Sequence, residues 1–207
     1  KSLDDSPSDN EKYKADFGRM FSAYFAALAM TVGFGALVTN FPNWIINEVG
    51  SSSAPGIGFA ILSLFGMATM VSPLMSRGYA STRIVPLTFG LGIIGLGLIL
   101  LTTLTGIWGA MASMAVFGIG FGMLFPTMKT ILTEATSIHT RGRAFGVFYA
   151  IYSLGVVVGS TGSGVILDIQ GDAGAGPFLF GATASLIAIP IAISIEMLRK
   201  HNSKDRY

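Results

Sequence analysis

Apolar residues gather along the chain into six long runs, which short polar stretches separate. A helix needs about 20 such residues to cross roughly 30 Å of hydrocarbon. The predicted spans are 21–41, 57–75, 84–104, 108–131, 144–167 and 178–198. The pattern therefore predicts an all-α, polytopic membrane protein with six transmembrane helices.

Polar segments flank the runs at both ends. Residues 1–19, rich in Asp, Ser and Lys, are interpreted as a polar linker, because such a composition does not support a packed core. Residues 20–198 form the transmembrane bundle, and residues 199–207 form a basic tail. The first run does not resemble a cleaved signal peptide, whose leading segment is short and basic. Because the chain begins at Lys1, the sequence favours a portion of a longer or processed protein.

Basic residues reveal an orientation for the predicted bundle. All 13 Lys and Arg residues lie before the first run, after the last, at the connection that follows the second run, or at the end of the fourth run and the connection after it. The other three connections, residues 42–56, 105–106 and 168–177, contain none. By the positive-inside rule the basic side is cytoplasmic, so we expect a cell-membrane protein with both termini in the cytoplasm.

Composition limits the chemistry that the chain can perform. Hydrophobic residues make up 51% of the sequence and charged residues 12%, about half the charge of an average soluble domain. The net charge of +2 therefore reports topology and not nucleic-acid binding. The chain has no cysteine, and we expect no cofactor and no metal ion.

Glycines recur in the predicted spans at the spacing that lets helices approach closely in lipid. A Gly-Phe-Gly stretch occurs at residues 33–35 and again at 120–122, and Phe-Pro follows each. These two helices run in opposite directions, which fits a 3+3 inverted repeat and equally fits chance similarity between Gly-rich and Phe-rich helices. The residues assigned to packing and gating are Gly33, Gly35, Gly120, Gly122, Pro126, Gly155 and Gly159.

Three loop and helix motifs carry a family resemblance. Residues 72–83 resemble a motif of the type Gly-x-Leu-Ala-Asp-Arg-x-Gly-Arg, an Arg-Gly-Arg sequence stands at 141–143, and a Gly-rich stretch covers 155–164. Together with six helices and a polar lead-in, they resemble the C-terminal six-helix half of a major facilitator superfamily (MFS) transporter. The resemblance implies a gating role for Arg77 and Arg141. In the family the motif's Asp interacts with a helix N-terminus and favours one conformation of the bundle; Ser76 stands at that position here and weakens this interaction.

The resemblance also implies which helices line a solute path. The first, second, fourth and fifth spans would face a cavity shared with an N-terminal six-helix half, and the third and sixth would face lipid. The candidate path residues are Tyr24, Thr31, Thr39, Ser63, Ser113, Phe117, Phe121, Tyr149, Tyr152 and Ser153. As an alternative, the hydroxyls bond to their own helix or bridge two helices without contacting a solute.

Ionisable residues are absent from the predicted midplanes, where they would mark proton relays or ion sites. Lys129 comes closest, but it lies about 31 Å along its helix from Trp108 at the usual rise per residue. We therefore expect its side chain to snorkel to the cytoplasmic surface. This half is predicted to contain neither a proton carrier nor a fixed cation that would hold an anionic solute.

The sequence thus predicts a secondary transporter, a symporter or antiporter among the possibilities, that moves a small organic solute. Two alternatives stay open, namely a self-sufficient six-span homodimer and a non-transporting receptor or scaffold of the same fold. An intramembrane serine protease is not expected. That chemistry needs a histidine to accept the serine proton, and the two histidines, His139 and His201, fall in the predicted loop and tail.

Overall fold

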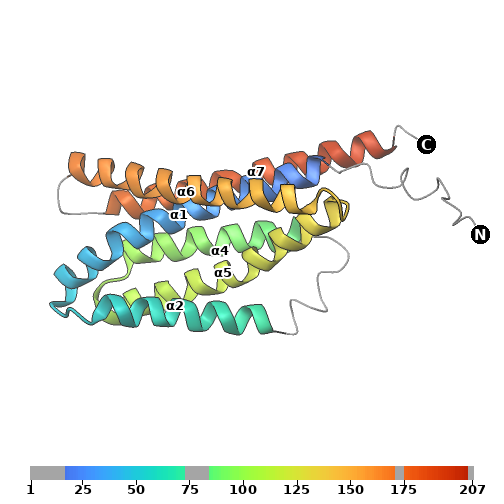
Figure 1. Cartoon of the computed structure of the whole chain (residues 1–207). Coiled ribbons are helices and arrows are strands. Elements are labelled where there is room, and N and C mark those ends of the chain that lie inside the picture. The colour runs from blue at the N-terminus through green and yellow to red at the C-terminus, as the bar shows by residue number, and fades with distance from the viewer. Residues whose placement is uncertain (1–16, 73–83, 171–174, 205–207) are drawn as a thin grey trace, which may run out of the picture.

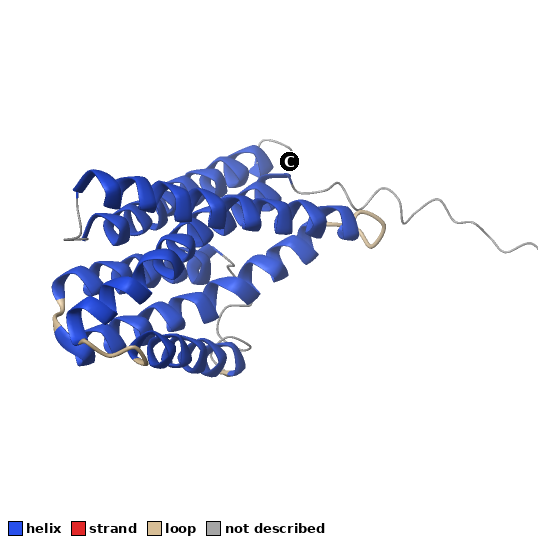
Figure 2. Cartoon of the chain, turned by 60° about the vertical axis from the view of Figure 1, so that its left-hand side comes forward, coloured by secondary structure: helices blue, strands red, loops and turns tan. Residues whose placement is uncertain are grey.

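The computed structural model describes residues 17–72, 84–170 and 175–204 of the chain. The helices are α1 (Phe17–Val49), α2 (Ala54–Val71), α4 (Ile84–Thr103), α5 (Gly106–Ala135), α6 (Arg141–Gln170) and α7 (Ala175–Lys204). All six are long and apolar enough to cross a membrane, and the described ranges contain no strand (Figure 2). The predicted all-α polytopic fold is confirmed.

Several helices extend beyond the apolar runs that predicted them. A hydrophobic run measures the hydrocarbon that a helix crosses, whereas the helix itself continues where its backbone hydrogen bonds continue. Treating residues 42–49 as part of a connection was therefore wrong, because α1 continues through Pro42 to Val49. It ends at Gly50, whose φ of 71° is a left-handed conformation that glycine adopts without strain. At the other end of the chain, α7 continues into the predicted tail.

The six helices form two triplets, the first of α1, α2 and α4 and the second of α5, α6 and α7. The first helix of each triplet packs chiefly against the second and third helices of the other (Figure 1). α1 packs chiefly against α6 and α7, and α5 packs chiefly against α2 and α4. α1 and α5 contact each other in the middle of the bundle, and α4 contacts α7. The start of α1 and the end of α7 lie at the same end of the bundle. This reciprocal packing is the arrangement that a 3+3 inverted repeat produces.

The crossing of α1 and α6 brings two backbones into contact. A Cβ added to Gly35 would collide with the carbonyl oxygen of Val156, and one added to Gly159 would collide with that of Val32. In lipid, burying apolar area does not drive helices together, so close backbone approach and van der Waals contact must hold them. The glycines therefore stabilise this crossing.

The crossing of α2 and α5 is built in the same way. A Cβ on Gly118 would collide with the carbonyl oxygen of Leu62, and one on Gly122 would collide with that of Gly66. In the 3+3 inverted repeat, α5 corresponds to α1, and α6 corresponds to α2. The two backbone crossings are thus equivalent, one in each half of the bundle.

The first glycine of each Gly-Phe-Gly stretch packs in an equivalent direction. A Cβ on Gly33 would lie 3.4 Å from the carbonyl oxygen of Gly181 in α7, and one on Gly120 would lie 3.0 Å from that of Gly90 in α4. In both cases the first glycine faces the third helix of the other triplet, and the second glycine faces its middle helix. The motif recurs because the same packing problem occurs twice.

Candidate functional site

The site region lies where α5 and α6 diverge. These two helices contact each other only sparsely, whereas each packs closely on α2 or on α1. α6 is also the least covered helix, with 17% of its most apolar window buried against 67% for α1. On another side, α4 and α7 form a shallow apolar groove that includes Phe89, Leu96 and Ile189. Within the described bundle, α6 therefore offers the most uncovered helix surface.

A continuous row of aromatic rings connects α1, α5 and α6. Successive ring centroids lie 5.4 to 6.5 Å apart, a spacing at which aromatic pairs attract. In order, this aromatic row consists of Phe117, Phe34, Phe121, Phe125, Tyr152, Phe148 and Tyr149. At one end of the row Phe117 in α5 is fully buried, and at the other end Tyr149 in α6 is 47% exposed.

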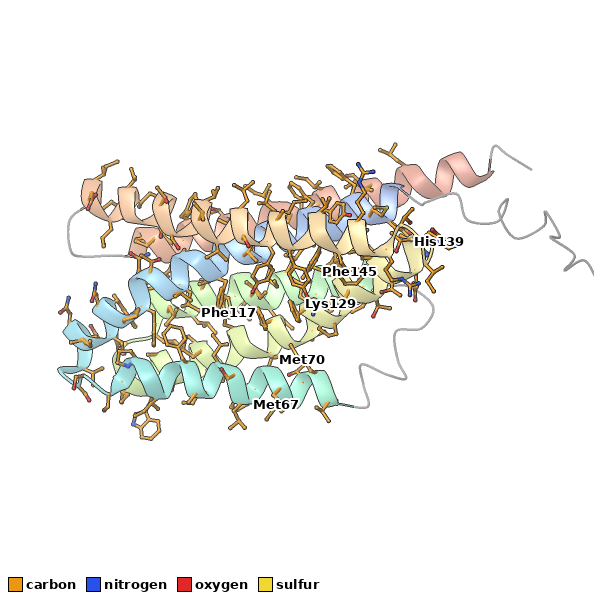
Figure 3. All side chains as sticks on the ribbon, viewed as in Figure 1. Met67, Met70, Phe117, Lys129, His139 and Phe145 are labelled. Atoms are coloured by element: carbon orange, nitrogen blue, oxygen red, sulfur yellow. The ribbon has the colours of Figure 1, made fainter. Side chains whose placement is uncertain are left out.

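Lys129 lies against the open part of the aromatic row. Its Nζ is 3.9 Å from the ring centroid of Phe125 in α5 and 5.7 Å from that of Tyr149 in α6. Figure 3 shows the residue in the strip between these two helices. An ammonium placed over ring faces is attracted by their quadrupoles, by about 0.5 to 2 kcal/mol depending on exposure.

The direction of the Lys129 side chain follows from its helix. Side chains in a helix lean toward its N-terminus, and α5 runs toward the end of the bundle where α1 starts. Lys129 therefore leans toward the middle of the bundle, where Phe125 lies one turn earlier. This direction differs from the one expected for an ammonium that snorkels to the cytoplasmic surface. Sequence position gave the depth of its Cα but did not account for the lean of the side chain.

Some of the predicted path residues are exposed or half-buried. Tyr152 and Phe121 are half-buried members of the aromatic row. Thr39, Ser63 and Ser153 are exposed on α1, α2 and α6 respectively. The structure thus brings the aromatic candidates of α5 and α6 together, while the three small hydroxyl residues lie apart on different helices.

Other predicted path residues are buried within the bundle. Thr31, Ser113 and Phe117 have no exposed surface. The hydroxyl of Thr31 donates to the carbonyl of Ala27 at 2.8 Å, and that of Ser113 donates to the carbonyl of Gly109 at 2.8 Å. These hydroxyls follow the alternative in which they bond to their own helix.

Tyr24 connects two helices. Its hydroxyl donates to the carbonyl of Ala144 at 3.1 Å, which joins the N-terminal part of α1 to the first turn of α6. In addition, Gly155 of α6 is held so close to Thr31 that a Cβ there would collide with the Thr31 hydroxyl. Both interactions strengthen the α1–α6 pair.

The residues assigned to gating lie at helix crossings and at one connection. Pro126 lies inside α5 and has no N–H, so the carbonyl of Gly122 loses its usual helical donor at the crossing with α2. Arg141 starts α6, and its Nη2 donates to the carbonyl of Thr133 at 3.3 Å, which joins the end of α5 to the start of α6. Arg77 lies outside the described residues.

Sequence reasoning missed a polar link inside the bundle. The side-chain amide of Asn40 donates to the hydroxyl of Ser163 at 2.8 Å and to the carbonyl of Ala36 at 2.8 Å. Asn40 is 6% exposed and Ser163 is fully buried. Asn43 and Asn47 follow Asn40 in the sequence, one and two turns further along α1. The one available signal was its place one residue before Phe41, still within the first apolar run.

The chain has six helices of membrane-spanning length, arranged as two triplets that pack against each other and are connected by a row of aromatic side chains. This arrangement defines a multi-pass helical membrane protein. Residues 23–206 match the Major Facilitator Superfamily. The chain therefore belongs to this family, which is a family of transporters and not of enzymes.

Known relatives agree with the family assignment. The chain is similar to the MFS-type transporter YhhS of Escherichia coli (strain K12), with 23% identity over 192 residues. It is 22% identical over 192 residues to YhhS of Salmonella typhimurium. Each alignment covers 91% of this chain and 45% of the relative, so the chain spans less than half the length of the curated relatives it matches.

Proposed function

We propose that this chain is the C-terminal helix bundle of a secondary transporter that moves a small organic solute by alternating access. The observation that carries the proposal is the aromatic row with Lys129, which lies where α5 and α6 diverge. A partly open row of rings and one cation suits the binding of a small organic molecule. Membership of a transporter family supports the same conclusion.

A second six-helix bundle is the proposed partner. α2 and α6 leave most of their surface uncovered in this chain, and the relatives are about twice as long as the matched region. In transporters of this kind, two bundles rock against each other around a central site. The N-terminal half would cover α2 and α6 and complete the solute path.

The proposed path uses the exposed and half-buried candidates. They are Thr39, Ser63, Phe121, Tyr149, Tyr152 and Ser153, to which the structure adds Phe125 and Lys129. Thr31, Ser113, Phe117 and Tyr24 are left out because they are buried or bridge helices. Their proposed role is to hold the bundle rigid.

The glycine-dense crossings are the proposed basis of rigid-body motion. Because α1–α6 and α2–α5 are in backbone contact, each pair would move as one body. Pro126 supplies a place where α5 can bend, next to the α2 crossing. The distribution of basic residues supports a location in the cell membrane with both termini in the cytoplasm.

Cysteine accessibility tests the proposed path. This chain has no cysteine, so single cysteines can be introduced into the whole protein once any elsewhere are removed. Tyr149→Cys and Ser153→Cys should react with a hydrophilic maleimide, because a solute path contains water. Leu96→Cys, on the apolar groove of α4, is the matched control and should stay unreactive in lipid. Equal protection of all three positions would contradict a path beside α6.

The homodimer alternative has its own test. The chain alone should insert into membranes, because its spans are apolar, yet liposomes that contain only the purified chain should not transport. Transport by such liposomes at the rate of the whole protein would establish a six-span transporter that works as a homodimer.

A further inference from the structure

Lys129 is a cation without an anionic partner in the described part of the chain. It is half-buried, and its interactions there are with the rings of Phe125 and Tyr149, not with a carboxylate. A charge removed from water needs compensation, which a neutral ring supplies only in part. An anion at the open side of Lys129 would supply the remaining compensation.

The surroundings of the ammonium favour a ligand with an apolar body. Phe125 covers one side of the Nζ, and Tyr152 lies against Phe125 with ring centroids 6.3 Å apart. The exposed Tyr149 forms the outer edge of the same group. A molecule that approaches from the open side would meet ring faces and a positive charge together.

The charge is also held in place. The lean of a helical side chain toward the helix N-terminus directs Lys129 onto Phe125, so the ammonium stays in the strip between α5 and α6. By contrast, Arg143 at the start of α6 is exposed and lies beside a different cavity at the end of the bundle. Of these two cations, Lys129 alone combines partial burial with aromatic neighbours.

We propose that Lys129 with Phe125, Tyr149 and Tyr152 forms a subsite for an organic anion, a carboxylate attached to an aromatic or apolar body. The inference rests on the proposed transport function and names its substrate class. The carboxylate pairs with the ammonium, and the ring system of the solute packs against the aromatic side chains. Charge-assisted hydrogen bonds of this kind are about twice as strong as neutral ones.

Ligand-dependent thermal stability of the purified whole protein tests the proposal. The probes are benzoate, 4-hydroxybenzoate and indole-3-acetate, each compared with its neutral amide at equal ionic strength. At least one carboxylate should raise the unfolding temperature of the wild type, and its amide should not. Lys129→Gln should weaken the apparent affinity for that carboxylate about tenfold or more, since a hydrogen bond to a charged group is lost. Lys129→Arg should retain part of the affinity.

Arg143→Gln is the matched control. It removes one positive charge from the same end of the bundle without touching the aromatic row, and it should leave the affinity unchanged. Equal stabilisation by carboxylate and amide, no stabilisation by any carboxylate, or an unchanged affinity in Lys129→Gln would each overturn the anion subsite.

Failure of this inference is distinguishable from failure of the transport proposal. If benzylamine or an amide binds in place of the carboxylates while Tyr149→Cys remains reactive to maleimide, the solute path stands and the anion subsite is wrong. If the cysteines beside α6 are unreactive, the transport proposal itself fails whatever binds.

Discussion

The rings of Phe34 and Phe121 lie with their centroids 5.8 Å apart in the middle of the bundle. Each is the central residue of a Gly-Phe-Gly stretch, one on α1 and one on α5. The equivalent helices of the 3+3 inverted repeat, α1 and α5, thus contact each other through equivalent residues. This contact decides between the two readings of the repeated motif, because chance similarity gives no reason for the two copies to touch.

We expect Gly122→Val to destabilise the protein. Its side chain would collide with the carbonyl oxygen of Gly66 in α2 and lie near Thr69, and neither backbone can shift without separating the helices. Overpacking of this kind typically costs about 1 to 3 kcal/mol, so the unfolding temperature should fall. Thermal unfolding of the detergent-solubilised whole protein measures the effect.

Gly92→Ala is the control for that substitution. Gly92 lies in α4 on the apolar groove beside α7, where an added methyl group would meet only the Ile189 side chain, at an ordinary contact distance of 3.7 Å. Its unfolding temperature should match or exceed that of the wild type, since alanine favours the helix. Equal destabilisation by both variants would mean that close packing at the α2–α5 crossing is not the cause.

Asn40 and Ser163 should be energetically coupled. Interhelical hydrogen bonds within membrane proteins contribute about 0.6 kcal/mol on average and up to about 1.7. A double-mutant cycle of Asn40→Ala and Ser163→Ala should therefore give a coupling free energy in that range. The measurement is reversible unfolding in mixed micelles. Strictly additive effects would show that the 2.8 Å contact contributes nothing to stability.

Tyr149→Phe and Thr31→Val should differ in their effects. Tyr149 is 47% exposed beside Lys129, so loss of its hydroxyl should slow transport of whichever solute stabilises the protein while leaving insertion intact. Thr31 is fully buried and bonded to its own helix, so Thr31→Val should leave transport rates close to wild type. Initial rates in proteoliposomes at matched protein amounts decide. Slowed transport in Thr31→Val with Tyr149→Phe unaffected would reverse the assignment of the path.

The orientation predicts which loops are reachable from outside. Ser52→Cys, in the exposed connection between α1 and α2, should react with an impermeant maleimide in intact cells. Ile138→Cys, in the connection between α5 and α6, is 77% exposed and should react only after the membrane is permeabilised. The reverse pattern would place the basic end of the bundle outside.

The number of helices, their class and the family were predictable from the sequence alone. A membrane imposes a length and an apolar composition on each span, and both are local properties that a linear pattern records. The glycine spacing also predicted close helix approach. It did not predict which residues each glycine would contact, since Gly35 and Val156 lie far apart in the chain and meet only in the folded bundle.

The tertiary structure alone decided which polar residues are buried and which are open. Thr31 and Tyr149 look alike in sequence, each a hydroxyl in an apolar run, yet one is enclosed at a helix crossing and the other lies at the edge of the aromatic row. The outcome depends on how each helix is rotated about its axis, which neighbouring helices set. Lys129 is a further example, because its ammonium lies near the ring of Tyr149 only where α6 is positioned beside α5.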